Sequence, residues 1–262
     1  MRSPTTPRRL AAGVLCMSVL APAAAGPARP DTEAQARARA IMMKMAQFLA
    51  GAPRFRVSMD AAYDSVQGSG QKIEFHEDRT VTLNRPDRLR VEGTRADGAQ
   101  VLTVFTGKDV VVVDHAGKVY ATAPQPGTLD ETIVYFVRDL GMRLPLAAML
   151  LGRLPAELEE RLPAVDYVGL ARLHGKPVHH IAARGATVDV QMWVAEGAQP
   201  LPQRVVLTYK QERGQPQFRA DFSKWNLAPE ITDATFAAPA AAGLQKVAFA
   251  TRVPRAPAKG AK

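Results

Sequence analysis

The chain has 262 residues, of which 47% are hydrophobic and 23% are charged, and its formal net charge is +9. Eight of its basic residues lie within the first nine positions or after Gln245, and without them residues 26–243 carry a formal charge of about +1. Nucleic-acid binding needs a basic face on the folded domain itself. The charge distribution therefore excludes nucleic acid as an expected partner.

The first 25 residues have the pattern of a secretory signal peptide. Arginines at positions 2, 8 and 9 precede an apolar segment at 10–20, and three alanines at 23–25 offer a cleavage site. The apolar segment is shorter than the roughly 20 residues that cross a bilayer, and no later segment of the sequence reaches that length. We therefore expect export to the periplasm, cleavage after about Ala25, and no integral membrane segment.

The single cysteine, Cys16, lies inside this apolar segment. A lipoprotein signal places a small residue directly before its cysteine, whereas Leu15 stands there, so we expect no lipid anchor. The mature chain then has no disulfide, no thiolate metal site and no cysteine nucleophile. A cysteine-free exported chain suits an oxidising periplasm.

Residues 26–250 form a single predicted domain, followed by a basic tail at 251–262 that we expect to be disordered. Asp31 or Thr32 can cap a helix that runs to about Leu49. The segment 128–162 interrupts a pattern of strands with apolar residues at helical spacing, which predicts a helical insert.

Alternating apolar residues predict strands on both sides of this insert. The first set forms an antiparallel meander of about six strands, with a break or bulge near Glu77 and Asp78. The second set adds a further meander and a final short strand. We therefore predict an α+β domain in which a strongly curved, unclosed antiparallel sheet of about ten or eleven strands forms a half-barrel covered by the N-terminal helix and the insert.

The interior of such a half-barrel leaves two alternatives open. It is either an ordinary packed core or a cavity lined by adaptable apolar side chains that takes a hydrophobic ligand. Periodicity along the strands and the insert selects eight candidate lining residues. They are Phe55, Val57, Met59, Leu89, Val91, Phe136, Leu146 and Met149.

Several features follow one another in the first half of the chain: an amphipathic helix, a strand that begins at Phe55, a Gly-x-Gly hairpin at 68–70, the pair Arg85-Pro86, and the hairpin "TGKDVVVVD". Over residues 53–122 this order resembles the opening of the LolA/LolB-like periplasmic lipoprotein carriers. Over roughly 35–250, including "HIAARG", "VQMWV", "LPQRVVLTYK" and "TFAAP", the chain resembles a family of predicted periplasmic proteins of unknown function within that superfamily.

The resemblance implies an unclosed β-barrel whose helices act as a lid over an apolar interior, which in the carriers holds lipoprotein acyl chains. Arg85 matches the carrier arginine that precedes a proline and bonds to the lid. We therefore expect a soluble periplasmic binding or carrier protein for a hydrophobic ligand, either a lipid or an acylated protein. Because related half-barrels also serve as envelope-stress sensors, the alternative is a sensor or scaffold that binds another envelope protein and has a filled interior.

His179 and His180 form the pair that most suggests catalysis. Adjacent side chains of a strand point to opposite faces, so we expect them not to share a metal ion. The sequence contains no zinc-protease motif, phosphate-binding loop, dinucleotide fingerprint or nucleophile elbow. We therefore expect no metal, no cofactor and no enzymatic activity, and a hydrolase without a motif is the weakest alternative.

Overall fold

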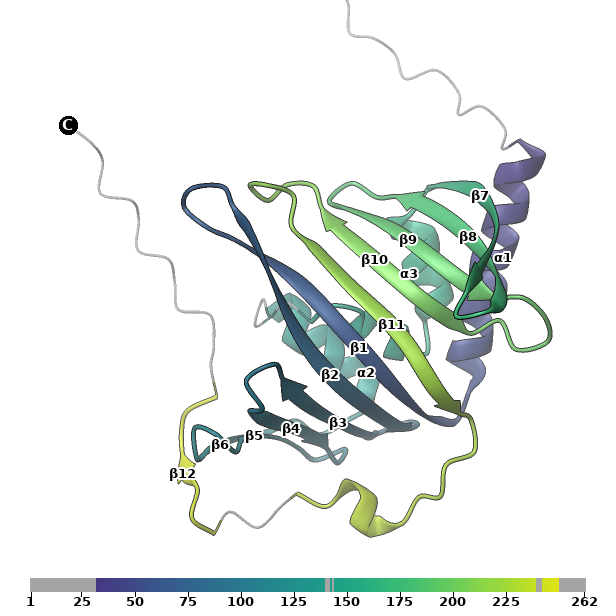
Figure 1. Ribbon diagram of the computed structural model, residues 1–262. Helices are drawn as coiled ribbons and strands as arrows, with labels where there is room; N and C mark the ends of the chain where they lie inside the picture. The colour runs from purple at the N-terminus through teal and green to yellow at the C-terminus, as the bar shows by residue number, and fades with distance from the viewer. Residues whose placement is uncertain (1–31, 140–141, 143, 239–241, 250–262) are drawn as a thin grey trace, which may run out of the picture. The chain divides into compact units, whose positions relative to one another are not determined.

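The computed structural model describes residues 32–139, 142, 144–238 and 242–249, so the predicted signal peptide and basic tail lie outside the described residues. The described chain forms a twelve-stranded sheet with helices on its concave face (Figure 1). The strands are β1 (Arg54–Val66), β2 (Lys72–Asn84), β3 (Arg88–Arg95), β4 (Gln100–Phe105), β5 (Asp109–Asp114), β6 (Val119–Pro124), β7 (Ala164–Leu173), β8 (Lys176–Arg184), β9 (Val188–Ala195), β10 (Pro202–Tyr209), β11 (Gln217–Asn226) and β12 (Gln245–Lys246). The helical elements are α1 (Glu33–Gly51), α2 (Leu129–Val134), the π-helix η1 (Tyr135–Asp139), α3 (Leu154–Arg161) and the 3₁₀-helices η2 (Ala147–Leu150) and η3 (Asp233–Phe236).

The strands lie in the order β12-β6-β5-β4-β3-β2-β1-β11-β10-β9-β8-β7. Two antiparallel meanders therefore meet where β1 pairs with β11, while β7 and β12 form the two edges of the sheet. The predicted α+β half-barrel is confirmed. The sheet has twelve strands where about ten or eleven were expected, and the predicted final short strand is the two-residue β12, which pairs in parallel with β6.

The predicted break in β2 is wrong. β2 runs without interruption through Glu77 and Asp78, and it pairs with β1 along its whole length without a register shift. Strand alternation lets the two adjacent acids stay in a regular strand, because each points to its own face of the sheet. Glu77 lies on the concave face and Asp78 is exposed on the convex face.

The helix α1 begins with a capping box. The Thr32 hydroxyl accepts a hydrogen bond from the backbone N–H of Gln35, whose side chain accepts one from the N–H of Thr32. Such reciprocal bonds satisfy N–H groups that lack partners inside the helix. One face of α1 buries Met42, Met45 and Leu49, and the helix lies behind the β7–β9 end of the sheet (Figure 1).

The helical insert, residues 128–162, contains α2, η1, η2 and α3. Thr128 and Glu131 make a second capping box at the start of α2. In Figure 1 α2 lies behind β1 and β2 and α3 lies behind β9 and β10, on the concave side of the sheet. None of the described helices is long and apolar enough to cross a membrane.

The convex face carries a separate, smaller apolar cluster. It consists of Leu102, Val104 and Val113 from β4 and β5, with Phe236 from η3 packed against them. The segment after β11 thus crosses the outside of the first meander before it reaches β12. The main core lies on the concave side, which is where the insert positions the candidate site.

Candidate ligand cavity

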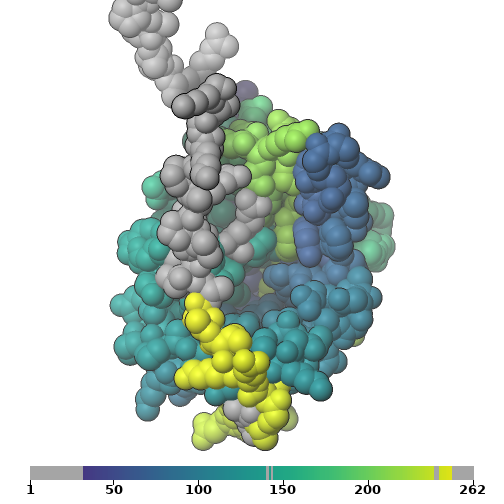
Figure 2. All heavy atoms as spheres, turned by 90° about the vertical axis from the view of Figure 1, so that its left-hand side faces the viewer, coloured from purple at the N-terminus to yellow at the C-terminus, as the bar shows by residue number. Residues whose placement is uncertain are grey.

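A cavity of about 460 Å³ lies between the concave face of the first meander and the helical insert. Small-molecule sites commonly have volumes of roughly 300–1,000 Å³. In the space-filling view the surface is hollowed between the blue strands of this meander and the teal insert (Figure 2). The structure therefore places a hollow where the sequence left a filled core as the alternative.

All eight candidate residues selected from the sequence line this cavity. They are Phe55, Val57, Met59, Leu89, Val91, Phe136, Leu146 and Met149. Five of them come from β1 and β3, whose alternate residues share the concave face, and three come from the insert. That these residues contact a ligand stays a prediction.

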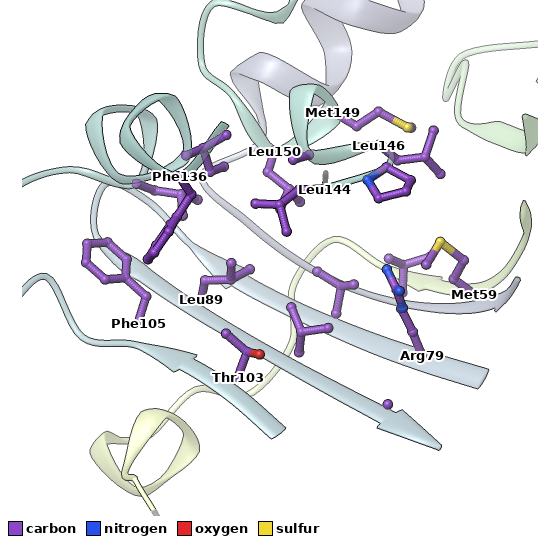
Figure 3. Close-up of a pocket in the computed structure, with 18 of the residues that line it drawn as sticks. Met59, Arg79, Leu89, Thr103, Phe105, Phe136, Leu144, Leu146, Met149 and Leu150 are labelled. Carbon is purple, nitrogen blue, oxygen red and sulfur yellow. The ribbon is translucent and has the colours of Figure 1, made fainter. Parts of the chain in front are cut away.

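The insert forms the roof of the cavity. Figure 3 shows the roof residues of the insert above the strands, and Leu89, Thr103 and Phe105 project from β3 and β4 toward them. The roof residues are Phe136, Leu144, Leu146, Met149 and Leu150. Phe136 is buried, whereas Leu144 is 37% exposed. The roof is thus enclosed at Phe136 and open to solvent at Leu144.

One end of the cavity is charged, and the sequence analysis missed it. Glu77 and Arg79 of β2 and Arg95 of β3 belong to the lining, and Arg79 and Glu77 form an ion pair. Arg79 projects from the strand toward the roof (Figure 3). The sequence does contain a signal for it. Arg79 lies two residues from Val81 and therefore points to the same face of the strand.

Arg85 lies in the turn between β2 and β3 and joins three segments. Its Nη1 donates a hydrogen bond of 2.8 Å to the carbonyl oxygen of Leu150, and its Nε donates one of 3.2 Å to that of Ala52. Its Nη1 also lies 3.8 Å from Oδ1 of Asp130. Burial lowers the pKa of Arg85 from its ordinary value, and the Asp130 carboxylate opposes part of that change. The side chain nevertheless stays charged, because arginine does not lose its proton in proteins.

Asp130 links this arginine to the insert a second time. Both of its carboxylate oxygens accept from the backbone N–H of Gly152 at 3.0 Å. The arginine matched by resemblance to the carriers' lid contact therefore does touch the roof. Its role as a latch stays a prediction.

His179 and His180 lie on opposite faces of β8, as strand alternation predicts. The Nδ1 of His179 lies 3.1 Å from the Tyr167 hydroxyl. The Nε2 of His180 lies 3.1 Å from Oε1 of Gln191, and its ring stacks on Trp193 with centroids 4.1 Å apart. The two histidines thus have separate partners and do not form one site.

A different histidine lies among carboxylates. The register of β1 and β2 brings Asp60, His76 and Asp78 together, and their potential ligand atoms all lie within 4.8 Å of one another. The Nδ1 of His76 is 3.4 Å from Oδ1 of Asp60. The sequence analysis missed this cluster because it depends on cross-strand pairing. All three residues are exposed, and we assign no metal to them.

A family model described as "Predicted periplasmic protein (DUF2092)" matches residues 38–250. The chain belongs to this family. The family expected from the sequence is therefore confirmed, and its description gives the periplasm as the predicted compartment. No curated protein sequence matches the chain.

Solved structures with a similar fold share little sequence with the chain. An uncharacterized conserved protein from Thermus thermophilus is 13% identical, with a TM-score of 0.48, over 80% of this chain and 99% of that one. A LolA superfamily protein from Nitrosomonas europaea is 12% identical, with a TM-score of 0.38, over 77% and 97%. The Pseudomonas aeruginosa MucA/MucB complex contains a chain that is 15% identical, with a TM-score of 0.42, over 85% and 67%.

Proposed function

We propose that this family member is a periplasmic binding or carrier protein for a hydrophobic ligand, either a lipid or the acyl chain of a modified protein. The observation that supports this proposal is the apolar cavity of about 460 Å³ beneath the helical insert. Burying apolar surface contributes about 25 cal/mol per Å², so a chain of methylene groups inside the cavity is held without any specific polar contact. The proposal includes removal of residues 1–25 on export and assigns no catalytic step.

Displacement of a hydrophobic fluorescent probe tests the proposal. The exported protein is expected to bind the probe with one site per chain and to release it when a long-chain lipid is added. A substitution that fills the cavity is expected to abolish probe binding without unfolding the protein. Probe binding that survives such a substitution would place the probe elsewhere and refute the assignment.

A second candidate function is supported by the edge of the sheet at β7. Val168 and Leu170 are 56% and 60% exposed on this strand, and β7 has a strand neighbour on one side only. Exposed edge strands offer unpaired backbone groups to a partner chain. We therefore retain a scaffold that binds another envelope protein as the alternative. Leu170→Lys is expected to release a stoichiometric partner in a pull-down if this alternative holds.

A further inference from the structure

The concave face of β2 and β3 changes from apolar to charged along its length. Side chains on one face of an antiparallel pair recur every second residue and lie opposite fixed partners. The four successive cross-strand pairs on this face are Leu83–Leu89, Val81–Val91, Arg79–Gly93 and Glu77–Arg95. Two apolar pairs are therefore followed directly by two pairs that carry three charges.

The burial of these residues follows the same gradient. Leu83 is fully buried and Leu89 is 8% exposed, whereas the side chains of Arg79 and Arg95 are 28% and 44% exposed. The apolar pairs thus lie at the deep end of the cavity and the charged pairs at its open end. An amphiphile fits such a gradient when its chain points inward and its head group stays near solvent.

The two arginines keep donors available at the open end. Arg79 is paired with Glu77. The guanidinium of Arg95 lies 3.8 Å from Asp97 and 3.7 Å from Asp114, and within the described part of the chain its side chain donates no hydrogen bond. Gly93 places no side chain opposite Arg79, which projects into the cavity (Figure 3).

We propose that the cavity selects an amphiphile with an anionic head group, a carboxylate or a phosphate, held by Arg79 and Arg95. This inference rests on the proposed function and adds the chemical class of the ligand. A guanidinium presents a planar fork of donors that matches both anions in two-point contacts. Glu77 pairs with Arg79, while Asp97 and Asp114 lie 3.8 and 3.7 Å from Arg95. The anionic head group is therefore held by the hydrogen-bond donors of the two guanidinium groups and not by an excess of positive charge.

A series of ligands with one chain and different head groups tests the proposal on the wild-type exported protein. Dodecanoic acid, dodecyl phosphate and dodecan-1-ol are each titrated against the bound fluorescent probe. At least one of the two anions is expected to displace the probe at a concentration about tenfold lower than the alcohol, since hydrogen bonds to charged groups contribute roughly 1.5–3 kcal/mol. Comparing the two anions distinguishes a carboxylate from a phosphate as the preferred head group.

Variants assign this preference to the two arginines. Arg79→Gln and Arg95→Gln are each expected to weaken displacement by the anion about tenfold, so that the anion loses its advantage over the alcohol when both are titrated against the same variant. Arg90→Gln is the matched control, because Arg90 lies on the convex face of β3 with a side-chain exposure of 24%, close to that of Arg79. An equal loss in the control would overturn the assignment.

The head-group series also separates the two levels of the proposal. If the alcohol and the anions displace the probe equally well, the cavity binds a chain and the proposed head-group selection is refuted. If none of the three displaces it, the proposed function itself fails. Displacement of the probe by inorganic phosphate alone would reveal a phosphate site that needs no hydrocarbon chain. It would also refute the proposal that the cavity selects an amphiphile.

Discussion

Arg85 donates a hydrogen bond of 2.8 Å from Nη1 to the carbonyl oxygen of Leu150, and this bond joins the turn between β2 and β3 to the roof of the cavity. The same guanidinium donates to Ala52, the residue that follows α1. One charged side chain therefore ties the N-terminal helix, the sheet and the insert together at the deep end of the cavity.

Replacing Arg85 by glutamine is expected to loosen the roof. The shorter, neutral side chain loses a charge-assisted hydrogen bond, which contributes about 1.5–3 kcal/mol. Amide hydrogen exchange across residues 147–152 is therefore expected to accelerate by about tenfold or more. Arg56→Gln, on the exposed convex face of β1, serves as the control. If Arg85→Gln leaves the amide hydrogen exchange of residues 147–152 unchanged, the proposed role of Arg85 as the latch of the roof is contradicted.

Filling the cavity is expected to remove ligand binding. Val91 is a half-buried lining residue of β3, and Val91→Phe adds a ring to the space beneath the roof. We expect the affinity for the fluorescent probe to fall at least about tenfold, because the ring occupies the volume that the probe fills.

The control for this variant uses the same substitution on the other face. Val111 of β5 is also half-buried but packs against the convex cluster, so Val111→Phe is expected to retain probe binding. Thermal unfolding of both variants checks that each remains folded. Equal loss of binding in the two variants would show that the probe reports on stability rather than on the cavity.

Asp64 is expected to make stability depend on pH. Its side chain is 5% exposed and accepts hydrogen bonds from Nη1 of Arg219 at 2.8 Å and from the N–H of Gln217 at 2.9 Å. Burial raises the pKa of this carboxyl, but these hydrogen bonds and the charges of Arg219 and Lys72 outweigh it, so the pKa lies below its ordinary value. A depressed folded-state pKa means that the carboxylate stabilises the fold above the unfolded-state pKa of about 3.9 and that this stabilisation is lost as the pH falls through the folded-state pKa.

Asp64→Asn is therefore expected to lower the free energy of unfolding at pH 7 by about 1–3 kcal/mol. The difference from wild type is expected to shrink as the pH falls below about 3.9, because the unfolded wild-type chain then binds a proton at Asp64 that the folded chain binds only at lower pH. Urea denaturation at pH 7 and at pH 3 measures both values, with Glu159→Gln on the exposed face of α3 as the control. A difference that stays constant between the two pH values would contradict this account.

The attachment of α1 to the sheet is expected to depend on its buried methionines. Met42 is fully buried in the main core, and Met42→Ala is expected to lower the free energy of unfolding by about 2–5 kcal/mol through lost burial and a new cavity. Lys44→Ala, exposed on the same helix, is expected to change it by less than about 0.5 kcal/mol. Equal effects in chemical denaturation would show that α1 contributes little to the core.

Side chains alternate between the two faces of a strand, and this explains why the sequence predicts the residues of β1 that line the cavity. Phe55, Val57 and Met59 follow one another at every second position of β1, and a one-residue error would have moved all three to the convex face. The same rule separates His179 from His180. These predictions depend on strand geometry alone and not on which strands are neighbours.

The features that the sequence analysis missed depend on pairing between strands. Arg79 and Arg95 come from different strands, and their approach at one end of the cavity follows from the register of β2 with β3. Charged residues within a strand are usually assigned to the solvent face, so an arginine that points into the cavity is not expected from the sequence alone. The sequence pattern that identifies this polar end is a charged residue two positions from an apolar residue that faces the cavity, as Arg79 is from Val81.

Native mass spectrometry of the protein purified from its own periplasm, followed by lipid extraction, tests the central claim most directly. The account predicts one chain of protein carrying one amphiphile with an anionic head group, and the bound species is lost in Val91→Phe but retained in Val111→Phe. A protein that purifies without any bound lipid, and that also fails to take up a hydrophobic probe, would contradict the proposed function.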